Sequence, residues 1–244
     1  MVWGRGGAAH LLVLSFAVVF VYTFYRKRQK GGISVKNILC FGDSNTFASH
    51  PLGGRHPYDV RWTGRLQALL GEGYRVIEEG LGGRTTVFED QIAPGRNGRA
   101  ALPIAIATHN PIDLIILMLG TNDLKEQYSV TMWDLARAME QLMHIIESYE
   151  YAPHYQKPQV LLVSPIAVGE GVEESPFGCF TCAAVPKSKM FAQTYAPVAE
   201  RYGAHFFDAA TVARPSAEDQ LHMDADSHRA LADALAEQVR SILG

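Results

Sequence analysis

Five short segments rich in apolar residues alternate along the chain with longer segments whose apolar positions recur every three or four residues. The short segments are residues 37–41, 74–78, 114–119, 159–163 and 204–207, and their length predicts strands. The longer segments are residues 60–70, 100–109, 130–149, 187–202 and 226–243, and their spacing predicts amphipathic helices. This alternation predicts an α/β domain of three layers, α/β/α, in which helices cover both faces of a parallel sheet.

The segment at residues 114–119 is wholly apolar, which favours a central strand that is covered on both faces. The simplest arrangement for the whole set is a five-stranded parallel sheet with a flavodoxin-like strand order. Polar or glycine-rich clusters follow the strands: Ser44 the first, Gly83 the second and Asn122 the third, while His222 lies beyond the fifth. Because ligands bind outside the carboxyl ends of the strands in such sheets, we expect these residues to meet on one rim.

A separate apolar segment, residues 8–25, precedes the first strand and is long enough to span a bilayer as a helix. The basic cluster at residues 26–30 follows it, which favours an uncleaved anchor with the next domain facing the cytoplasm. Two alternatives stay open: a cleaved signal peptide, which would make the domain secreted or periplasmic, and a gene start assigned too early. We predict a membrane anchor with a basic linker at residues 1–32 and a folded domain at residues 33–244.

The composition is that of an ordinary globular protein. Of the 244 residues, 48% are hydrophobic and 19% are charged, and the formal net charge of -3 gives no general attraction to nucleic acid. The three cysteines are too few for a disulfide scaffold and indicate free thiols in a reducing compartment. Cys179 and Cys182 form a single Cys-x-x-Cys pair without two further ligands, so we predict a redox-sensitive thiol pair, no metal and no cofactor.

Ser44 lies where the first strand breaks at a glycine, and a serine needs a base before it can act as a nucleophile. Of the nine histidines, His222 is the best candidate, because Asp219 precedes it by three residues on an irregular segment. That carboxylate can reach Nδ1 of the imidazole and leave Nε2 free to face a serine. The rival is His228, which falls within the last predicted helix, where we expect a capping or surface role.

Three candidate donors could bind the oxyanion that forms when a serine attacks a carbonyl. They are the backbone N–H of Ser44, the backbone N–H of Gly83 and the side-chain amide of Asn122. Turn or cap chemistry explains each of them equally well when it is taken alone. Found together at strand ends, with a serine and an Asp-x-x-His pair, they predict a serine hydrolase site.

Four sequence blocks resemble those of the SGNH (GDSL-type) hydrolases, in the same order and over about residues 36–243. The blocks are Gly42-Asp43-Ser44-Asn45, Gly80-Leu81-Gly82-Gly83, Gly120-Thr121-Asn122-Asp123 and Asp219-Gln220-Leu221-His222. Two positions depart from the usual pattern, since the family more often carries Leu where Asn45 stands and Asn where Glu78 stands. Residues 59–64, 77–86 and 118–123 look most like the arylesterase/acyltransferase branch.

The resemblance implies an SGNH hydrolase fold and assigns roles within it. Ser44 would be the nucleophile, His222 the base and Asp219 the residue that orients it. The oxyanion hole would consist of Ser44, Gly83 and Asn122. Asp43 and Asp123 would then be structural.

The function implied by the resemblance is that of a serine esterase that hydrolyses short-chain or aryl carboxylic esters through an acyl-enzyme. Acyl transfer to another alcohol or to peroxide is a further outcome of the same chemistry, and we expect the loop at residues 165–186 to set the selectivity. Two alternatives stay open: a carbohydrate O-acetylesterase or lysophospholipase with the same triad, and a non-catalytic membrane-anchored binding module. The predicted partners are a small ester substrate and, through the N-terminal helix, a membrane. Nucleic acid is not expected as a partner, and the formation of a homo-oligomer stays open.

Overall fold

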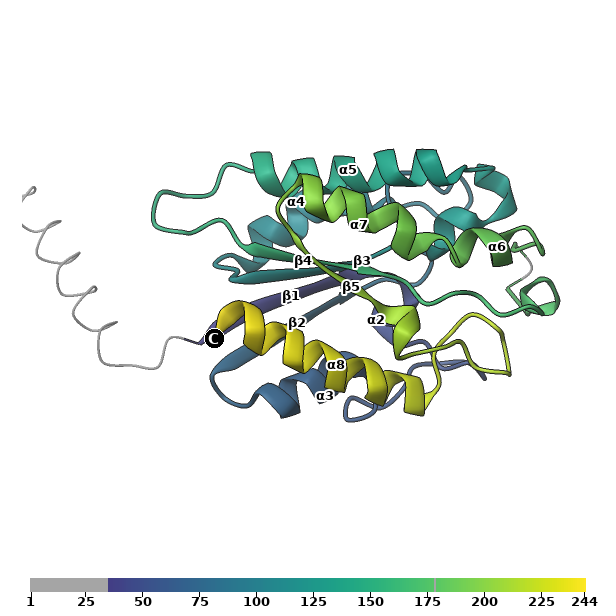
Figure 1. Ribbon diagram of the computed structural model, residues 1–244, viewed down its shortest axis with the longest axis horizontal. Coiled ribbons are helices and arrows are strands. Elements are labelled where there is room, and N and C mark those ends of the chain that lie inside the picture. The colour runs from purple at the N-terminus through teal and green to yellow at the C-terminus, as the bar shows by residue number, and fades with distance from the viewer. Residues whose placement is uncertain (1–34, 178) are drawn as a thin grey trace, which may run out of the picture. The chain divides into compact units, whose positions relative to one another are not determined.

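The computed structural model describes residues 35–177 and 179–244, in which five strands form one parallel sheet (Figure 1). The strands are β1 (Lys36–Gly42), β2 (Tyr74–Gly80), β3 (Leu114–Met118), β4 (Gln159–Ser164) and β5 (His205–Asp208). Their order in space is β2-β1-β3-β4-β5, and all four neighbouring pairs are parallel. The predicted five-stranded sheet with a flavodoxin-like order is therefore confirmed.

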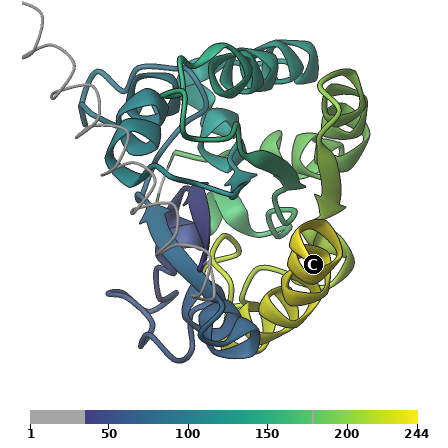
Figure 2. The ribbon, with the colours of Figure 1, turned by 90° about the vertical axis from the view of Figure 1, so that its left-hand side faces the viewer.

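Helices cover both faces of the sheet, as the alternation of elements predicted (Figure 2). On one face lie α4 (Gly98–His109), α5 (Met132–Ser148) and α7 (Phe191–Arg201), and on the other lie α3 (Trp62–Leu70) and α8 (Ala225–Leu243). Strand β1 contributes to two separate apolar cores, because successive side chains of a strand point to opposite faces. Leu39 and Phe41 pack with the first group of helices, and Ile38 and Cys40 pack with the second.

The chain between β4 and β5 differs from the prediction. The single helix expected over residues 187–202 is wrong, because the structure has two helices there, α6 (Ala184–Ser188) and α7 (Phe191–Arg201). Pro186, which the prediction placed at the end of a loop, lies in the first turn of α6. Proline is tolerated there because an N–H group in the first turn has no partner within the helix.

Several short helices complete the described part of the chain. Strand β1 is followed at once by α2 (Ser44–Phe47), where the sequence predicted only a turn. Four 3₁₀ helices lie in the connections: η1 (Thr121–Leu124), η2 (Glu126–Tyr128), η3 (Val172–Glu174) and η4 (Ala209–Thr211). Helices α2 and α6 lie at the carboxyl ends of the strands (Figure 1). This end of the sheet is where the polar clusters were expected to meet.

The predicted anchor at residues 8–25, and with it the predicted boundary between residues 32 and 33, lies outside the described residues. Within the residues that the structure does describe, no helix combines the length and the apolar character that crossing a membrane requires.

Candidate active site

Ser44 is the first residue of helix α2 and is almost completely buried. The preceding residue, Asp43, caps the helix, since its side chain accepts a hydrogen bond from the N–H of Asn45 at 2.9 Å. The backbone carbonyl of Asp43 accepts from the N–H groups of Thr46 and Phe47 at 3.1 and 2.8 Å. These bonds use the N–H groups of Asn45, Thr46 and Phe47, the other three residues of the helix. The N–H group of Ser44 takes part in none of them.

Gly80 allows the Ser44 helix to lie directly on the end of β2. A Cβ atom at this position would lie 2.1 Å from the backbone nitrogen of Phe47, far inside van der Waals contact. Any side chain there would push the helix away from the strand. The second glycine block therefore places Ser44 as well as offering a donor.

His222 and Asp219 form a buried pair in the segment before α8. The carboxylate Oδ2 of Asp219 lies 2.6 Å from Nδ1 of His222, and its Oδ1 accepts from the backbone N–H groups of Leu221 and His222 at 3.0 and 2.9 Å. Burial opposes ionisation of this carboxyl, but these hydrogen bonds together lower the pKa of Asp219 below its usual value. A charged carboxylate at Nδ1 holds the proton on that nitrogen and leaves Nε2 as an acceptor.

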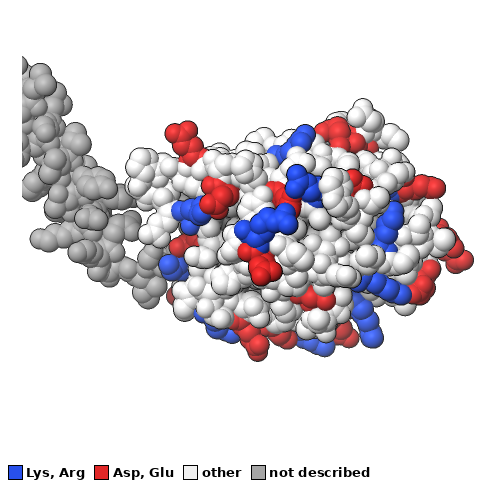
Figure 3. Space-filling view, turned by 45° about the horizontal axis from the view of Figure 1, so that its top comes forward, with Lys and Arg blue, Asp and Glu red and all other residues white. Residues whose placement is uncertain are grey.

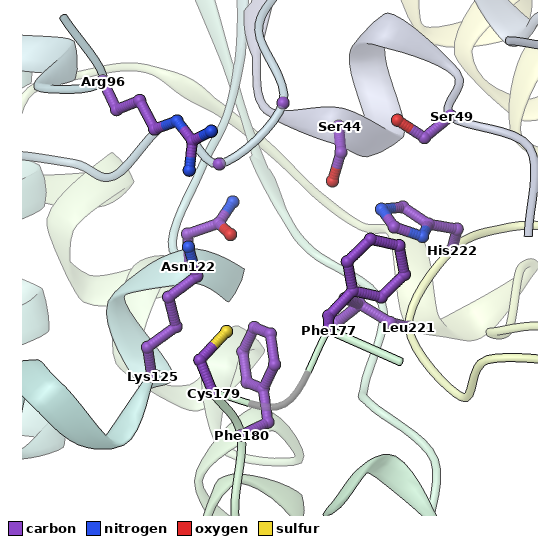
Figure 4. Close-up of a pocket in the computed structure, with 12 residues that line it drawn as sticks. Ser44, Ser49, Arg96, Asn122, Lys125, Phe177, Cys179, Phe180, Leu221 and His222 are labelled. Atoms are coloured by element: carbon purple, nitrogen blue, oxygen red, sulfur yellow. The ribbon is translucent and has the colours of Figure 1, made fainter. Parts of the chain in front are cut away.

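The side chains of Ser44 and His222 point into the same cavity, and the second ring nitrogen of His222 is directed toward the Ser44 hydroxyl (Figure 4). The ring of Phe177 stands edge-on against the imidazole, with the two ring centroids 4.9 Å apart. The structure thus brings together Ser44, Asp219 and His222, which the sequence places at opposite ends of the domain.

Asn45 is a residue whose importance the sequence did not reveal. Its side-chain amide donates to the carbonyl of Leu221 at 3.3 Å and accepts from the N–H of Met223 at 3.0 Å. The two contacts hold the backbone on either side of His222 against the helix that carries Ser44. The departure from the usual leucine at this position was the available signal, because an amide can bridge a carbonyl and an N–H whereas leucine cannot.

Gly83 occupies the third position of a turn that is closed by a hydrogen bond from the N–H of Arg84 to the carbonyl of Leu81, at 3.0 Å. Its φ of 78° lies in the left-handed region, which a turn of this kind fills with glycine. The Asn122 side chain reaches the same cavity from η1, directly after β3, and its amide nitrogen donates to the carbonyl of Arg84 at 3.1 Å. Ser44, Gly83 and Asn122, the three predicted donors, therefore line one cavity.

The buried side chain of Arg84 links the ends of β1 and β2. Its guanidinium donates to the carbonyl of Gly42 at 2.9 Å and to that of Glu79, and lies over the ring of Phe41 at 4.2 Å. Since the carbonyl of Arg84 receives the Asn122 amide, this link also places one of the predicted oxyanion donors.

Two buried carboxyl groups, those of Asp123 and Asp43, form hydrogen bonds next to the site. Asp123 accepts hydrogen bonds from the backbone N–H and the hydroxyl of Thr86, and Asp43 caps α2. Burial raises the pKa of Asp123 to about 7 and that of Asp43 to about 6, although these hydrogen bonds act in the opposite direction. Their hydrogen bonds hold the turns around Ser44 and Asn122.

His228 does not reach the cavity, and the surface role expected for it is wrong. The residue is fully buried in α8, where its Nδ1 accepts from the backbone N–H of Trp62 at 3.4 Å. Its ring stands edge-on to that of His56, with the centroids 5.0 Å apart. Burial lowers the pKa of His228 to about 3, so the ring packs as a neutral core residue between α8 and α3.

Glu78, which stands where the SGNH family more often has Asn, ties β2 to the segment before and within α3. It accepts hydrogen bonds from the hydroxyl of Thr63 and from Arg61, the latter at 3.0 Å, and lies 3.4 Å from the guanidinium of Arg55. At this position the chain therefore has a carboxylate with two arginine partners, where the SGNH family more often has the amide of an asparagine.

The cavity has a volume of about 280 Å³. Its wall combines the residues already described with residues from five connecting segments: Ser49, Gly82, Arg96, Lys125, Phe177, Cys179, Phe180 and Leu221. Three of these, Phe177, Cys179 and Phe180, belong to the loop at residues 165–186, so this loop forms part of the cavity wall. Across residues 35–177 and 179–244, no three histidine, cysteine or acidic side chains converge where a metal ion could bind.

Comparison with known proteins gives consistent matches. The model of the GDSL-like lipase/acylhydrolase family matches residues 40–230. The structure of an aryl esterase from M. smegmatis is 39% identical, with 86% of this chain and 100% of that chain covered and a TM-score of 0.79. A carbohydrate acetylesterase from Sinorhizobium meliloti is 34% identical over 85% and 100% of the two chains, with a TM-score of 0.80. A putative arylesterase from Agrobacterium tumefaciens is 39% identical over 86% and 100%, with a TM-score of 0.78. No curated protein gives a significant match to this chain.

Proposed function

From the premise that the chain belongs to the GDSL-like lipase/acylhydrolase family and is a carboxylic ester hydrolase, we propose that it hydrolyses short-chain or aryl esters with Ser44 as its nucleophile. The observation that supports this most directly is that Ser44, Gly83, Asn122 and His222 line one cavity, with Asp219 hydrogen-bonded to His222.

In the first half of the reaction, Oγ of Ser44 attacks the ester carbonyl while Nε2 of His222 takes its proton. Asp219, held charged by its hydrogen bonds, stabilises the imidazolium that forms. The carbonyl oxygen becomes an oxyanion and accepts from the N–H groups of Ser44 and Gly83 and from the amide of Asn122. When the tetrahedral intermediate collapses, the alcohol leaves with the proton from Nε2, and the acyl group stays on Ser44.

In the second half, a water molecule gives a proton to Nε2 and attacks the acyl-enzyme, which releases the acid and restores Ser44. Another alcohol or peroxide can take the place of water, in which case the product is an ester or a peracid. The apolar rings of Phe177 and Phe180 in the cavity wall favour an acceptor with apolar surface, which supports acyl transfer as a second outcome.

Removal of acetyl groups from sugars is the second candidate function. It is favoured by the 34% identity to a carbohydrate acetylesterase over nearly the whole domain. The two candidates share every catalytic residue and differ in the alcohol part of the ester. A comparison of acetylated sugars with aryl acetates at equal concentration separates them.

Labelling with a fluorophosphonate probe tests the assignment of the nucleophile, because only an activated serine reacts with this reagent. We expect the intact protein to be labelled, the probe to be found by mass spectrometry on Ser44, and Ser44→Ala to lose both labelling and hydrolysis of p-nitrophenyl acetate. Ser49 lines the same cavity and serves as an internal control. A probe attached to Ser49, or full activity in Ser44→Ala, would contradict the proposal.

The membrane anchor at residues 8–25 also remains a proposal, supported by the apolar run and the basic cluster that follows it. Cell fractionation of the full chain and of a chain lacking residues 1–32 tests it. We expect the full chain in the membrane fraction, resistant to washing with high salt, and the shortened chain in the soluble fraction. A full chain that is released by salt, or one that is shortened during secretion, would contradict the anchor.

A further inference from the structure

We propose that Arg96 and Lys125 bind a carboxylate carried by the acyl part of the substrate, so that the preferred substrates are half-esters of short dicarboxylic acids. This inference rests on the proposed function, because it names the acyl group that reaches Ser44. Neither residue belongs to one of the four sequence blocks, and both side chains point into the cavity on either side of Asn122 (Figure 4).

The guanidinium of Arg96 lies directly over Gly83. A Cβ atom built on Gly83 would lie 2.6 Å from Nη1 of Arg96 and 2.8 Å from its Cζ. The charge of Arg96 therefore stands beside one of the proposed oxyanion donors. Its acidic neighbour is Asp90, whose Oδ2 lies 3.6 Å from Nη1, and this contact orients the guanidinium toward the cavity wall.

Lys125 is a buried cation whose amino group lines the cavity. Among the described residues, no acidic oxygen lies within 4.0 Å of that amino group, whereas most buried lysines are paired. Taking an ammonium out of water without a partner is unfavourable, so a buried lysine in this position fits an anionic ligand.

The balance of charges indicates how much negative charge the ligand carries. The cavity wall holds Arg96 and Lys125 and no Asp or Glu. On the face of the molecule shown in Figure 3, by contrast, acidic and basic side chains are interspersed. Asp90 lies near Arg96, and the N–H groups of Ala93 and Ile92, followed by the charges of Lys125 and Arg96, lower its pKa although burial opposes this. Two cations and one carboxylate leave one net positive charge, which matches a single carboxylate better than a phosphate dianion.

The arrangement around Ser44 indicates which part of the ester carries this charge. His222 lies on one side of Ser44, whereas Arg96, Asn122 and Lys125 lie on the other (Figure 4). Because His222 gives its proton to the departing alcohol, the alcohol part must lie on the His222 side. The acyl chain then extends past Asn122 toward Arg96 and Lys125. A cavity of about 280 Å³ leaves room for a short chain, such as that of succinate or glutarate.

The overall reaction is that of the proposed function. The bond between the acyl carbon and the alcohol oxygen breaks, water supplies the new hydroxyl group, and the products are a dicarboxylate and an alcohol. The second carboxylate takes no part in the bond changes and binds to the two cations, which lowers the free energy of the transition state relative to that of a neutral ester.

Four benzyl esters test the inference on the full-length protein, with release of benzyl alcohols followed by chromatography. Monobenzyl succinate carries the charge on its acyl part, and benzyl succinamate has the same shape without the charge. Benzyl acetate reports basal esterase activity, and 4-carboxybenzyl acetate carries the charge on its alcohol part. We expect kcat/KM for monobenzyl succinate to exceed that for benzyl succinamate by about 10-fold or more, the range of one charged hydrogen bond.

The variant Lys125→Met keeps most of the apolar stem and removes the charge. We expect it to lower kcat/KM for monobenzyl succinate by about 10- to 100-fold and that for benzyl succinamate by less than about threefold. Lys189→Met removes an exposed lysine paired with Glu170, outside the cavity wall, and controls for net charge. We expect it to match the intact protein on all four esters.

Three results would overturn the inference. The intact protein would show no preference for the succinate over the succinamate, Lys125→Met would slow both equally, or 4-carboxybenzyl acetate would be the favoured anion. Failure of the proposed function would look different, because the intact protein would then neither hydrolyse benzyl acetate nor react with the fluorophosphonate probe.

Discussion

The side-chain amide of Asn122 donates a hydrogen bond to the backbone carbonyl of Arg84 across 3.1 Å. A carbonyl can only accept, so this contact places the amide nitrogen, rather than the amide oxygen, on the side of Arg84. One of the two amide protons is used in this bond, and the other is left for the cavity. The amide is therefore oriented before any substrate binds, and it requires no rearrangement when the negative charge develops.

Replacing Asn122 with Ala should lower kcat on p-nitrophenyl acetate by about 10²- to 10³-fold and leave KM nearly unchanged. The reason is that the amide binds an oxyanion that exists only after Ser44 has attacked. Steady-state kinetics give both constants, and fluorophosphonate labelling shows whether Ser44 is still activated. A rise in KM with kcat intact would mean that Asn122 binds the substrate in its ground state instead.

Gly83 offers a second test of the oxyanion donors, with a matched control elsewhere in the chain. Gly83 and Gly71 have φ values of 78° and 77°, so alanine is strained at both. A Cβ atom at Gly83 would meet the Arg96 guanidinium at 2.6 Å, whereas one at Gly71 would meet nothing within 4 Å. We expect both Gly→Ala variants to lose stability in thermal melts, and only Gly83→Ala to lose about 10-fold or more in kcat/KM.

Equal activity losses in the two glycine variants would show that backbone strain alone, acting at a distance, explains the effect at Gly83. Normal activity in both would remove the Gly83 N–H from the proposed oxyanion hole.

The sequence was sufficient to predict the sheet and the rim on which the polar residues meet. Each strand was marked by apolar residues, and a parallel sheet brings the carboxyl ends of all its strands to one edge. This is why residues as distant as Ser44 and His222 could be placed together without coordinates. Residues whose role depends on side-chain contacts between irregular segments carried no such signal. Arg96 and Lys125 come from loops after β2 and β3, and no periodicity relates those loops to the cavity.

Helix α2, the position of Pro186 and the burial of His228 could also not be predicted from the sequence. Helix α2 has four residues, too few to show the period of a helix. The predicted loop ends at Pro186, whereas in the structure this proline lies in the first turn of α6, where proline is tolerated. His228 was expected at the surface, but helix α8 buries it against α3, and only the packing of the two helices shows this.

Asn45 should prove essential for the position of His222. Asn45→Ala leaves the carbonyl of Leu221 and the N–H of Met223 without their buried partner, which should lower the free energy of unfolding by about 1–3 kcal/mol. We also expect a lower kcat, because the segment with His222 is no longer held against α2. The control is Asn37→Ala in β1, which removes a hydrogen bond of 2.8 Å from the side-chain amide of Asn37 to the carbonyl of Pro111. We expect Asn37→Ala to lower the free energy of unfolding in urea and to keep the kcat of the unmodified protein. An equal loss of kcat in both variants would contradict the role of Asn45 in positioning His222.

The buried carboxyl of Asp123 should make stability depend on pH. Burial, offset in part by Thr86, raises its pKa from 3.8 to about 7 in the folded protein. Between these values the folded state holds a proton that the unfolded state has released. The free energy of unfolding therefore falls as the pH rises through this window, by up to about 1.4 kcal/mol per pH unit, and the effect ends above the folded-state pKa.

Asp123→Asn isolates this contribution, because an amide does not titrate. Urea unfolding of both proteins at several pH values between about 4 and 8 gives the difference in their free energies of unfolding. Asp43, whose pKa is raised to about 6, titrates in both proteins and largely cancels. We expect the advantage of the unmodified protein over the variant to shrink as the pH rises. A difference that stays constant with pH would mean that Asp123 is ionised throughout.

The two oxygens of Asp219 have separate partners, which makes Asp219→Asn an informative substitution. Oδ1 accepts two backbone N–H groups, so the oxygen of an asparagine must take that place and its amide nitrogen must face Nδ1 of His222. An N–H facing Nδ1 makes that nitrogen an acceptor and moves the ring proton to Nε2, where it blocks the transfer from Ser44. We expect kcat to fall by about 10³- to 10⁴-fold while thermal melts change little, since every backbone contact is kept. Measured activity close to that of the unmodified protein would show that the tautomer of His222 is set by something other than Asp219, and the proposed triad would have to be abandoned.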